Sequence, residues 1–119
     1  MNSIHTICKQ ALLIGLMLNI LPAQDAAAAD PDHYKVVLEN DQVRVLRISY
    51  GPHEKSVMHE HKPGVLVFLT DGEGSMTFAD GRKEDFTFKA GGVGWEDGTK
   101  HLPANTLGIA HELILVELK

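Results

Sequence analysis

The sequence is poor in cysteine, in aromatic residues and in basic residues. Its 119 residues include a single cysteine, and only 6% are aromatic. Lysine and arginine total 11 against 16 aspartates and glutamates, which gives a formal net charge of -5. This balance argues against nucleic-acid binding, because such proteins need a basic surface to neutralise phosphates. The 44% of hydrophobic residues is typical of a folded globular chain rather than a disordered one.

The N-terminal region contains an apolar run that is too short to cross a membrane. Residues 11–21 read ALLIGLMLNIL, follow the cation Lys9, and precede the small-residue tract 26–29. A bilayer-spanning helix needs about 20 apolar residues, whereas a short apolar centre before small residues is typical of a secretory signal peptide. We therefore predict a signal peptide over residues 1–29 with cleavage near Ala29, and a periplasmic or secreted protein with no stable membrane insertion after cleavage. An N-terminal amphipathic helix that stays attached is the alternative.

The only cysteine, Cys8, lies inside this predicted signal peptide. Residues 30–119 therefore form no disulfide, even in an oxidising compartment. Their length predicts one domain. Its stability must come from core packing, alone or with help from a metal ion or a partner subunit.

The remaining chain has strand and turn signals and no convincing helix. Short β-rich or alternating segments are separated by turn residues, and Asp80-Gly81 is a strong hairpin signal. Roughly eight short strands at this spacing predict an all-β sandwich or barrel over residues 30–119. The clearest segments are 34–39, 42–50, 65–70, 75–79, 84–89 and 111–118.

Two histidines one residue apart stand near the middle of the chain, His59 and His61. On a strand, residues two apart face the same side, so both imidazoles would point inward while Glu60 points away. Two such rings can bind one cation if another strand supplies a third ligand. Alone, the pattern fits two solvent-facing histidines equally well.

The surroundings of this pair resemble the cupin superfamily of small β-barrels. The first cupin motif, G-x5-H-x-H-x(3,4)-E-x6-G, is matched by His59, His61 and Gly72, and the second, G-x5-P-x-G-x2-H-x3-N, by His101 and Asn105. The resemblance covers the whole of residues 30–119. It implies a jelly-roll-like single-domain barrel of the monocupin type, with His59, His61 and His101 as ligands of a divalent metal.

The chain departs from the cupin motifs at three positions. Val65 stands where the glutamate ligand is expected, His53 where the first glycine is expected, and Asp97 at the proline position of the second motif. Three neutral imidazoles would leave the ion its full charge, and imidazole ligands suit Zn, Fe, Cu or Ni better than Mn. Val65 would make one wall of the site apolar.

Three further residues are candidates for the site. His53 could supply a fourth nitrogen, and Glu96 or Asp97 could restore a carboxylate, although an exposed acidic turn is the simpler interpretation of the latter two. Trp95 is predicted to lie in the barrel core, and Arg44 to face solvent from its strand.

Three functions fit these features. The first is a metal-dependent cupin that acts on a small molecule in the barrel, as an oxygenase or isomerase. The second is a non-catalytic periplasmic protein that binds a small molecule or a metal ion. The third is a metal-free degenerate barrel that acts as a homodimer, with residues 34–39 as the pairing edge. Because one fold supports many chemistries, the resemblance does not decide between enzyme and binding protein.

Overall fold

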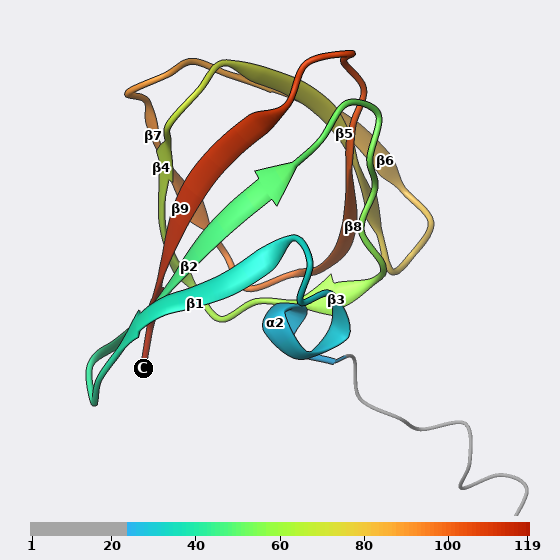
Figure 1. The fold of residues 1–119 in the computed structure, drawn as a ribbon. Helices are drawn as coiled ribbons and strands as arrows, with labels where there is room; N and C mark the ends of the chain where they lie inside the picture. Colours follow the sequence, from blue (N-terminus) through green and yellow to red (C-terminus); the bar gives the residue numbers. More distant parts are fainter. Residues whose placement is uncertain (1–23) are drawn as a thin grey trace, which may run out of the picture.

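The computed structural model describes residues 24–119, and the prediction of an all-β chain is confirmed (Figure 1). One short helical turn, α2 (Ala26–Ala29), precedes nine strands. The strands are β1 (Tyr34–Glu39), β2 (Val43–Tyr50), β3 (His59–Glu60), β4 (Gly64–Phe68), β5 (Gly72–Phe78), β6 (Lys83–Phe88), β7 (Val93–Glu96), β8 (Lys100–Asn105) and β9 (His111–Leu118).

The strands form two antiparallel sheets that face each other (Figure 1). The larger sheet has the order β1-β2-β9-β4-β7, and the smaller one has the order β3-β8-β5-β6. The last strand, β9, lies at the centre of the larger sheet and pairs with β2 from Val43↔Leu118 to Tyr50↔His111. The C-terminal strand therefore lies between two strands from earlier in the chain, β2 and β4.

The core lies between the two sheets. Successive side chains of a strand point to opposite faces, and β2 and β9 place alternate residues inward. Leu46 and Leu115 are almost completely buried, at 0% and 1% exposure, and each such burial stabilises the fold by about 1.5–3 kcal/mol. Across the core, Phe68 of the larger sheet stacks on Phe88 of the smaller one, with ring centroids 4.3 Å apart.

Two strands lie outside the segments that the sequence indicated most clearly. Strands β7 and β8 contain Gly94 and Pro103, which are unfavourable in strands and hide the alternating pattern. They form because β4 and β5 pair with them along their length. The predicted hairpin at Asp80-Gly81 is present, and Gly81 adopts a φ of 89° that favours glycine.

The predicted signal peptide lies largely outside the described residues, because the structure describes none of residues 1–23. Residues 24–29 are described, and they pack against the barrel: Ala26 is fully buried, and Glu60 donates a backbone hydrogen bond to Gln24. Within residues 24–119, no helix is both long enough and apolar enough to span a membrane.

Candidate metal centre

Three buried histidines meet where β3 and β8 pair. His59 and His101 stand directly opposite each other in these strands, and His61 follows β3 by one residue. Their exposures are 0%, 3% and 5%, and each offers a ring nitrogen within 4.8 Å of those of the other two. The structure thus brings together the three histidines that the sequence singled out, while Glu60 is only partly buried.

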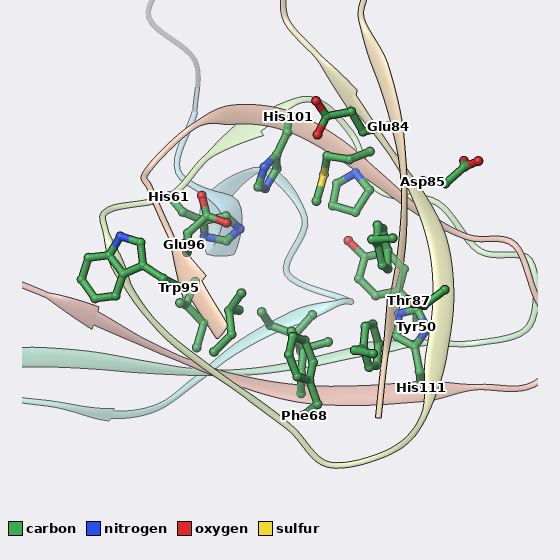
Figure 2. Close-up of a pocket in the computed structure, with 18 of the residues that line it drawn as sticks. Tyr50, His61, Phe68, Glu84, Asp85, Thr87, Trp95, Glu96, His101 and His111 are labelled. Atoms are coloured by element: carbon green, nitrogen blue, oxygen red, sulfur yellow. The ribbon is translucent and has the colours of Figure 1, made fainter. Parts of the chain in front are cut away.

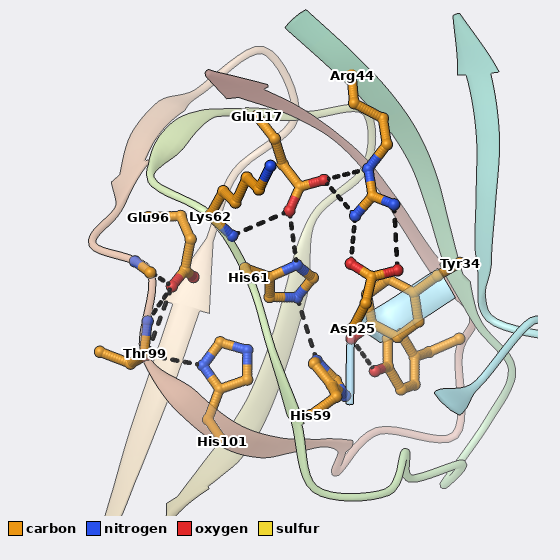
Figure 3. A network of polar contacts seen from close by, with 12 residues as sticks. Asp25, Tyr34, Arg44, His59, His61, Lys62, Glu96, Thr99, His101 and Glu117 are labelled. Carbon is orange, nitrogen blue, oxygen red and sulfur yellow. Dashed lines mark hydrogen bonds and ion pairs between the residues drawn. The ribbon is translucent and has the colours of Figure 1, made fainter. Parts of the chain in front are cut away.

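The spacing of these nitrogens fits a transition-metal ion. His59 Nε2 and His61 Nε2 lie 3.1 Å apart (Figure 3). A metal bound to imidazole at about 2.0–2.1 Å holds neighbouring ligand nitrogens about 2.8–3.4 Å apart, for angles between octahedral and tetrahedral. The two rings are therefore already placed as ligands of one ion would be.

The outer nitrogens of His59 and His101 are held by hydrogen bonds. His59 Nδ1 donates to the carbonyl of Val57 at 2.8 Å, which leaves the lone pair of Nε2 free for the cluster. His101 Nδ1 lies 3.0 Å from Thr99 Oγ1, which lies 3.4 Å from Glu96 Oε1. Such partners fix the tautomer and the orientation of a metal-binding imidazole.

The outer nitrogen of His61 faces a buried carboxylate from the last strand, Glu117 (Figure 3). His61 Nδ1 has no hydrogen-bond partner among the described residues, and Glu117 Oε2 is 3.6 Å away. Arg44 Nε donates to Glu117 Oε1 at 2.7 Å, and the backbone N–H of Lys62 donates to Oε2 at 3.1 Å. Burial would raise the pKa of Glu117, but His61, Arg44 and this N–H lower it to about 2, so the group is a carboxylate. 

His59 and His101 are neutral near pH 7. Burial, reinforced by the neighbouring imidazoles, lowers the pKa of His59 to about 3 and that of His101 to about 4. A neutral imidazole offers the lone pair that a metal ion requires. His59 and His101 are therefore in the protonation state for binding a cation.

A cavity of about 280 Å³ opens beside His61 and His101 (Figure 2). The hydroxyls of Tyr34 and Tyr50 meet at 2.5 Å in its wall, and burial raises the pKa of both, so they stay protonated. At the other end His111 is 3% exposed. The rest of the lining is mostly apolar, with Leu66, Phe68, Met76, Phe78, Phe86, Phe88, Leu113 and Leu115 among its residues.

The other predicted site residues lie outside the histidine cluster. His53 is exposed in the loop before β3, with a φ of 57° and a backbone hydrogen bond to Leu107. Glu96 lines the cavity, but its Oε1 accepts the N–H groups of Gly98 and Thr99 and so closes the turn before β8. Asp97 is exposed in the same turn.

Strand β4 faces the opposite way from the sequence prediction. Leu66 and Phe68 line the cavity, so Val65 between them points to the outer face of the sheet. The prediction that Val65 forms a wall was therefore wrong by one residue, and Leu66 supplies the apolar surface.

Sequence reasoning missed Glu117 and misplaced two other residues. Arg44, predicted to face solvent, is partly buried beside Glu117, and Trp95, predicted in the core, is 53% exposed at the cavity wall. The signal for Glu117 was present in β9, where it continues the inward-facing series of His111 and Leu113. A carboxylate on a buried strand face needs a partner.

Comparisons with known proteins show the fold. No family model matches the sequence, and no curated protein matches it. A cupin domain from Bordetella pertussis Tohama I is similar in structure, with 19% identity, a TM-score of 0.68, and coverage of 84% of this chain and 99% of that one.

Two further solved structures agree. An RmlC-like cupin family protein with a double-stranded β-helix fold from Methanocaldococcus jannaschii has a TM-score of 0.58 at 18% identity, covering 71% of this chain and 77% of that chain. The polyketide cyclase from Streptomyces resistomycificus has a TM-score of 0.53 at 16% identity, covering 71% and 63%. This chain therefore has the cupin fold, a double-stranded β-helix with a buried cluster of three histidines.

Proposed function

We propose that this protein binds one divalent transition metal, Zn, Fe, Cu or Ni, through His59, His61 and His101. The observation that carries the proposal is the buried cluster itself, in which the Nε2 atoms of His59 and His61 lie 3.1 Å apart and the rings of His59 and His101 are neutral. A bound ion would act as a Lewis acid and would lower the pKa of a coordinated water. Without an ion, burial of the three histidines would place polar nitrogens against one another and would contribute little to the stability of the fold.

We further propose that the cavity holds a small, mostly apolar molecule with one polar group directed to the metal. Its volume of about 280 Å³ lies near the lower end of the range for ligand pockets, about 300–1,000 Å³. Stacked phenylalanines favour an apolar or aromatic ligand, since Phe86 and Phe88 are nearly parallel at 5.9 Å. The paired hydroxyls of Tyr34 and Tyr50 are a polar point in the cavity wall, and the Tyr34 ring lies 4.8 Å from that of His59.

The same site fits two alternative functions. One is catalysis as a metal-dependent oxygenase or isomerase, and the other is non-catalytic capture of a metabolite or metal ion. They differ in whether a bound molecule is changed. Ligand recovered unaltered after incubation with the metal-loaded protein supports capture, and a new product supports catalysis.

Export and dimer formation are separate proposals. The apolar run and the small-residue tract support export with removal of a leader. Strand β1 lies at the edge of the larger sheet and exposes Val36, Val37 and Leu38 at 46%, 56% and 51%, which supports pairing of two copies. Light scattering after size exclusion tests this: a dimer is expected for the parent chain and a monomer for Leu38→Lys, whereas a concentration-independent monomeric parent contradicts it.

The first experiment measures bound metal in protein purified without a histidine tag. About one divalent ion per chain is expected, and none for the triple variant His59→Ala/His61→Ala/His101→Ala. His53→Asn is the matched control, because it removes an exposed histidine and asparagine tolerates a positive φ; its metal content should equal that of the parent. A parent chain that binds none of the four metals contradicts the proposal and favours the metal-free dimer.

A second experiment tests the cavity with p-cresol as the probe. Trp95 is the only tryptophan and lies in the cavity wall, so its fluorescence should change as p-cresol binds. Leu113→Phe, which fills part of the cavity, should weaken binding at least tenfold while leaving the metal content unchanged. Equal binding by parent and variant would contradict the proposed ligand position.

A further inference from the structure

The segment Gln24–Asp30 contains α2 and lies against the barrel beside β3 (Figure 1). Its backbone is tied to β3, because Glu60 N–H donates to Gln24 at 2.9 Å and Asp25 forms a bridge with Glu60. Ala26 is fully buried in the core. The segment is thus packed beside the two residues that flank Glu60, which are both histidines of the cluster.

One chain of contacts runs from this segment to His61 (Figure 3). The carboxylate of Asp25 accepts hydrogen bonds from both Nη atoms of Arg44, one of them at 3.1 Å. Arg44 donates in turn to Glu117 at 2.7 Å, and Glu117 lies 3.6 Å from His61 Nδ1. Because Arg44 is held between two carboxylates, the position of Glu117 depends on Asp25.

A second chain of contacts runs from the same segment to His59. Asp30 Oδ2 accepts from Ser56 Oγ at 2.6 Å and from His33 Nδ1 at 2.7 Å. Ser56 Oγ lies 3.2 Å from His59 Nδ1, where it can accept part of the hydrogen bond that this N–H also gives to Val57. The segment therefore reaches the outer nitrogens of two of the three histidines.

We infer that Gln24–Asp30 is an integral part of the metal centre, in which Asp25 positions His61 through Arg44 and Glu117, and Asp30 positions His59 through Ser56. The inference rests on the proposed metal site. Partners of the outer nitrogen hold an imidazole in the ligating tautomer and orientation, and losing one costs about 10–100-fold in metal affinity. Glu117 places its negative charge behind the His61 ring, on the Nδ1 side away from the proposed ion.

This role bears on the predicted cleavage of the leader. Cleavage near Ala29 would remove Asp25 and Ala26. Of the two carboxylates that begin the chains of contacts, only Asp30 would remain. The inference therefore requires the processed chain to begin at or before Gln24. Intact-mass measurement of the protein exported with its own leader tests this, and a chain that begins at Asp30 yet binds metal as tightly as the full chain would overturn the inference.

The direct test uses cobalt(II) and the full chain. Chelator competition gives the cobalt affinity, and the visible absorption spectrum at saturation reports the geometry of the ligands. Glu117→Gln is expected to lose about 10–100-fold in affinity and Asp25→Ala about tenfold, each with an altered spectrum. Asp25→Asn, which keeps the shape of the side chain, covers the case in which the alanine variant does not fold.

Asp32→Asn is the matched control, since Asp32 is an exposed aspartate just beyond the segment. It should match the parent in affinity and spectrum. If Asp25→Ala has a lower melting temperature but the parent's cobalt affinity and spectrum, Asp25 is only structural and the inference is wrong. If the parent itself binds no cobalt, the proposed metal site fails and the inference fails with it, so the two failures are distinguishable.

Discussion

The two ends of the barrel cavity differ in how their histidines are supported. At the metal end, which is the end with the proposed metal site, the outer nitrogens of His59 and His101 have hydrogen-bond partners, and that of His61 has none but lies 3.6 Å from the carboxylate of Glu117. At the far end, His111 packs edge-on against Phe88, and its Nδ1 has no partner among the described residues. Both ends bury histidines, but only in the cluster do ring nitrogens from three histidines come within 4.8 Å of one another, as the proposed metal site requires.

Acid should have the largest effect, and it should act on the metal end. In the unfolded chain an imidazole titrates near 6.5, whereas folding lowers the pKa of His59 to about 3 and that of His101 to about 4. The unfolded state therefore binds more protons below pH 6.5, and the stability of the metal-free protein should fall as pH decreases from 6.5 towards 3.

Glu117 adds to this loss below its unfolded pKa of 4.5, because its folded pKa is about 2. Urea unfolding of the EDTA-treated protein across this pH range checks the prediction. The triple histidine variant is the control and should show a much shallower loss between pH 6.5 and 4.5. An equal loss in both proteins would place the acid sensitivity elsewhere.

Removing the buried carboxylate should be the next largest change. Glu117→Ala leaves Arg44 partly buried without one of its two partners, and breaking a buried ion pair costs about 3–5 kcal/mol. Because Asp25 still pairs with Arg44, we expect a value at the lower end of this range. The free energy of unfolding from urea titration measures it, and a change below about 1 kcal/mol would show that the pair contributes little.

Truncation in the apolar wall should destabilise the fold without affecting the metal. Leu115 is 1% exposed, and Leu115→Ala should cost about 2–5 kcal/mol through lost burial and an enlarged cavity. The metal content of the purified variant should remain equal to that of the parent. A loss of metal here would mean that the two ends of the cavity are not independent.

The smallest effect is expected from replacing the histidine at the far end. His111→Phe keeps a ring and removes an unpartnered buried nitrogen, so its stability should stay within about 1 kcal/mol of the parent. The same change at the metal end, His61→Phe, should abolish metal binding. Metal analysis of both variants tests this difference between the two ends, and loss of metal in His111→Phe would contradict it.

Alternating segments and turn residues were sufficient to predict an all-β sandwich or barrel. The resemblance to the cupin motifs, rather than the local pattern, added His101 to the pair His59 and His61. The positions of Trp95 and Val65 were wrong because alternation gives two faces without saying which is inner. That choice depends on pairing with strands distant in sequence, and here β9 and β7 set the face of β4.

What the sequence by itself determined is the set of strand-forming segments and the residue types able to bind a metal, since both depend on neighbours along the chain. Only the tertiary structure decided the outer partners of the histidines. Arg44 and Glu117 are 73 residues apart and meet because β2 pairs with β9, while Asp25 joins them because α2 packs below β3. Barrel closure creates these contacts, and no local pattern encodes them.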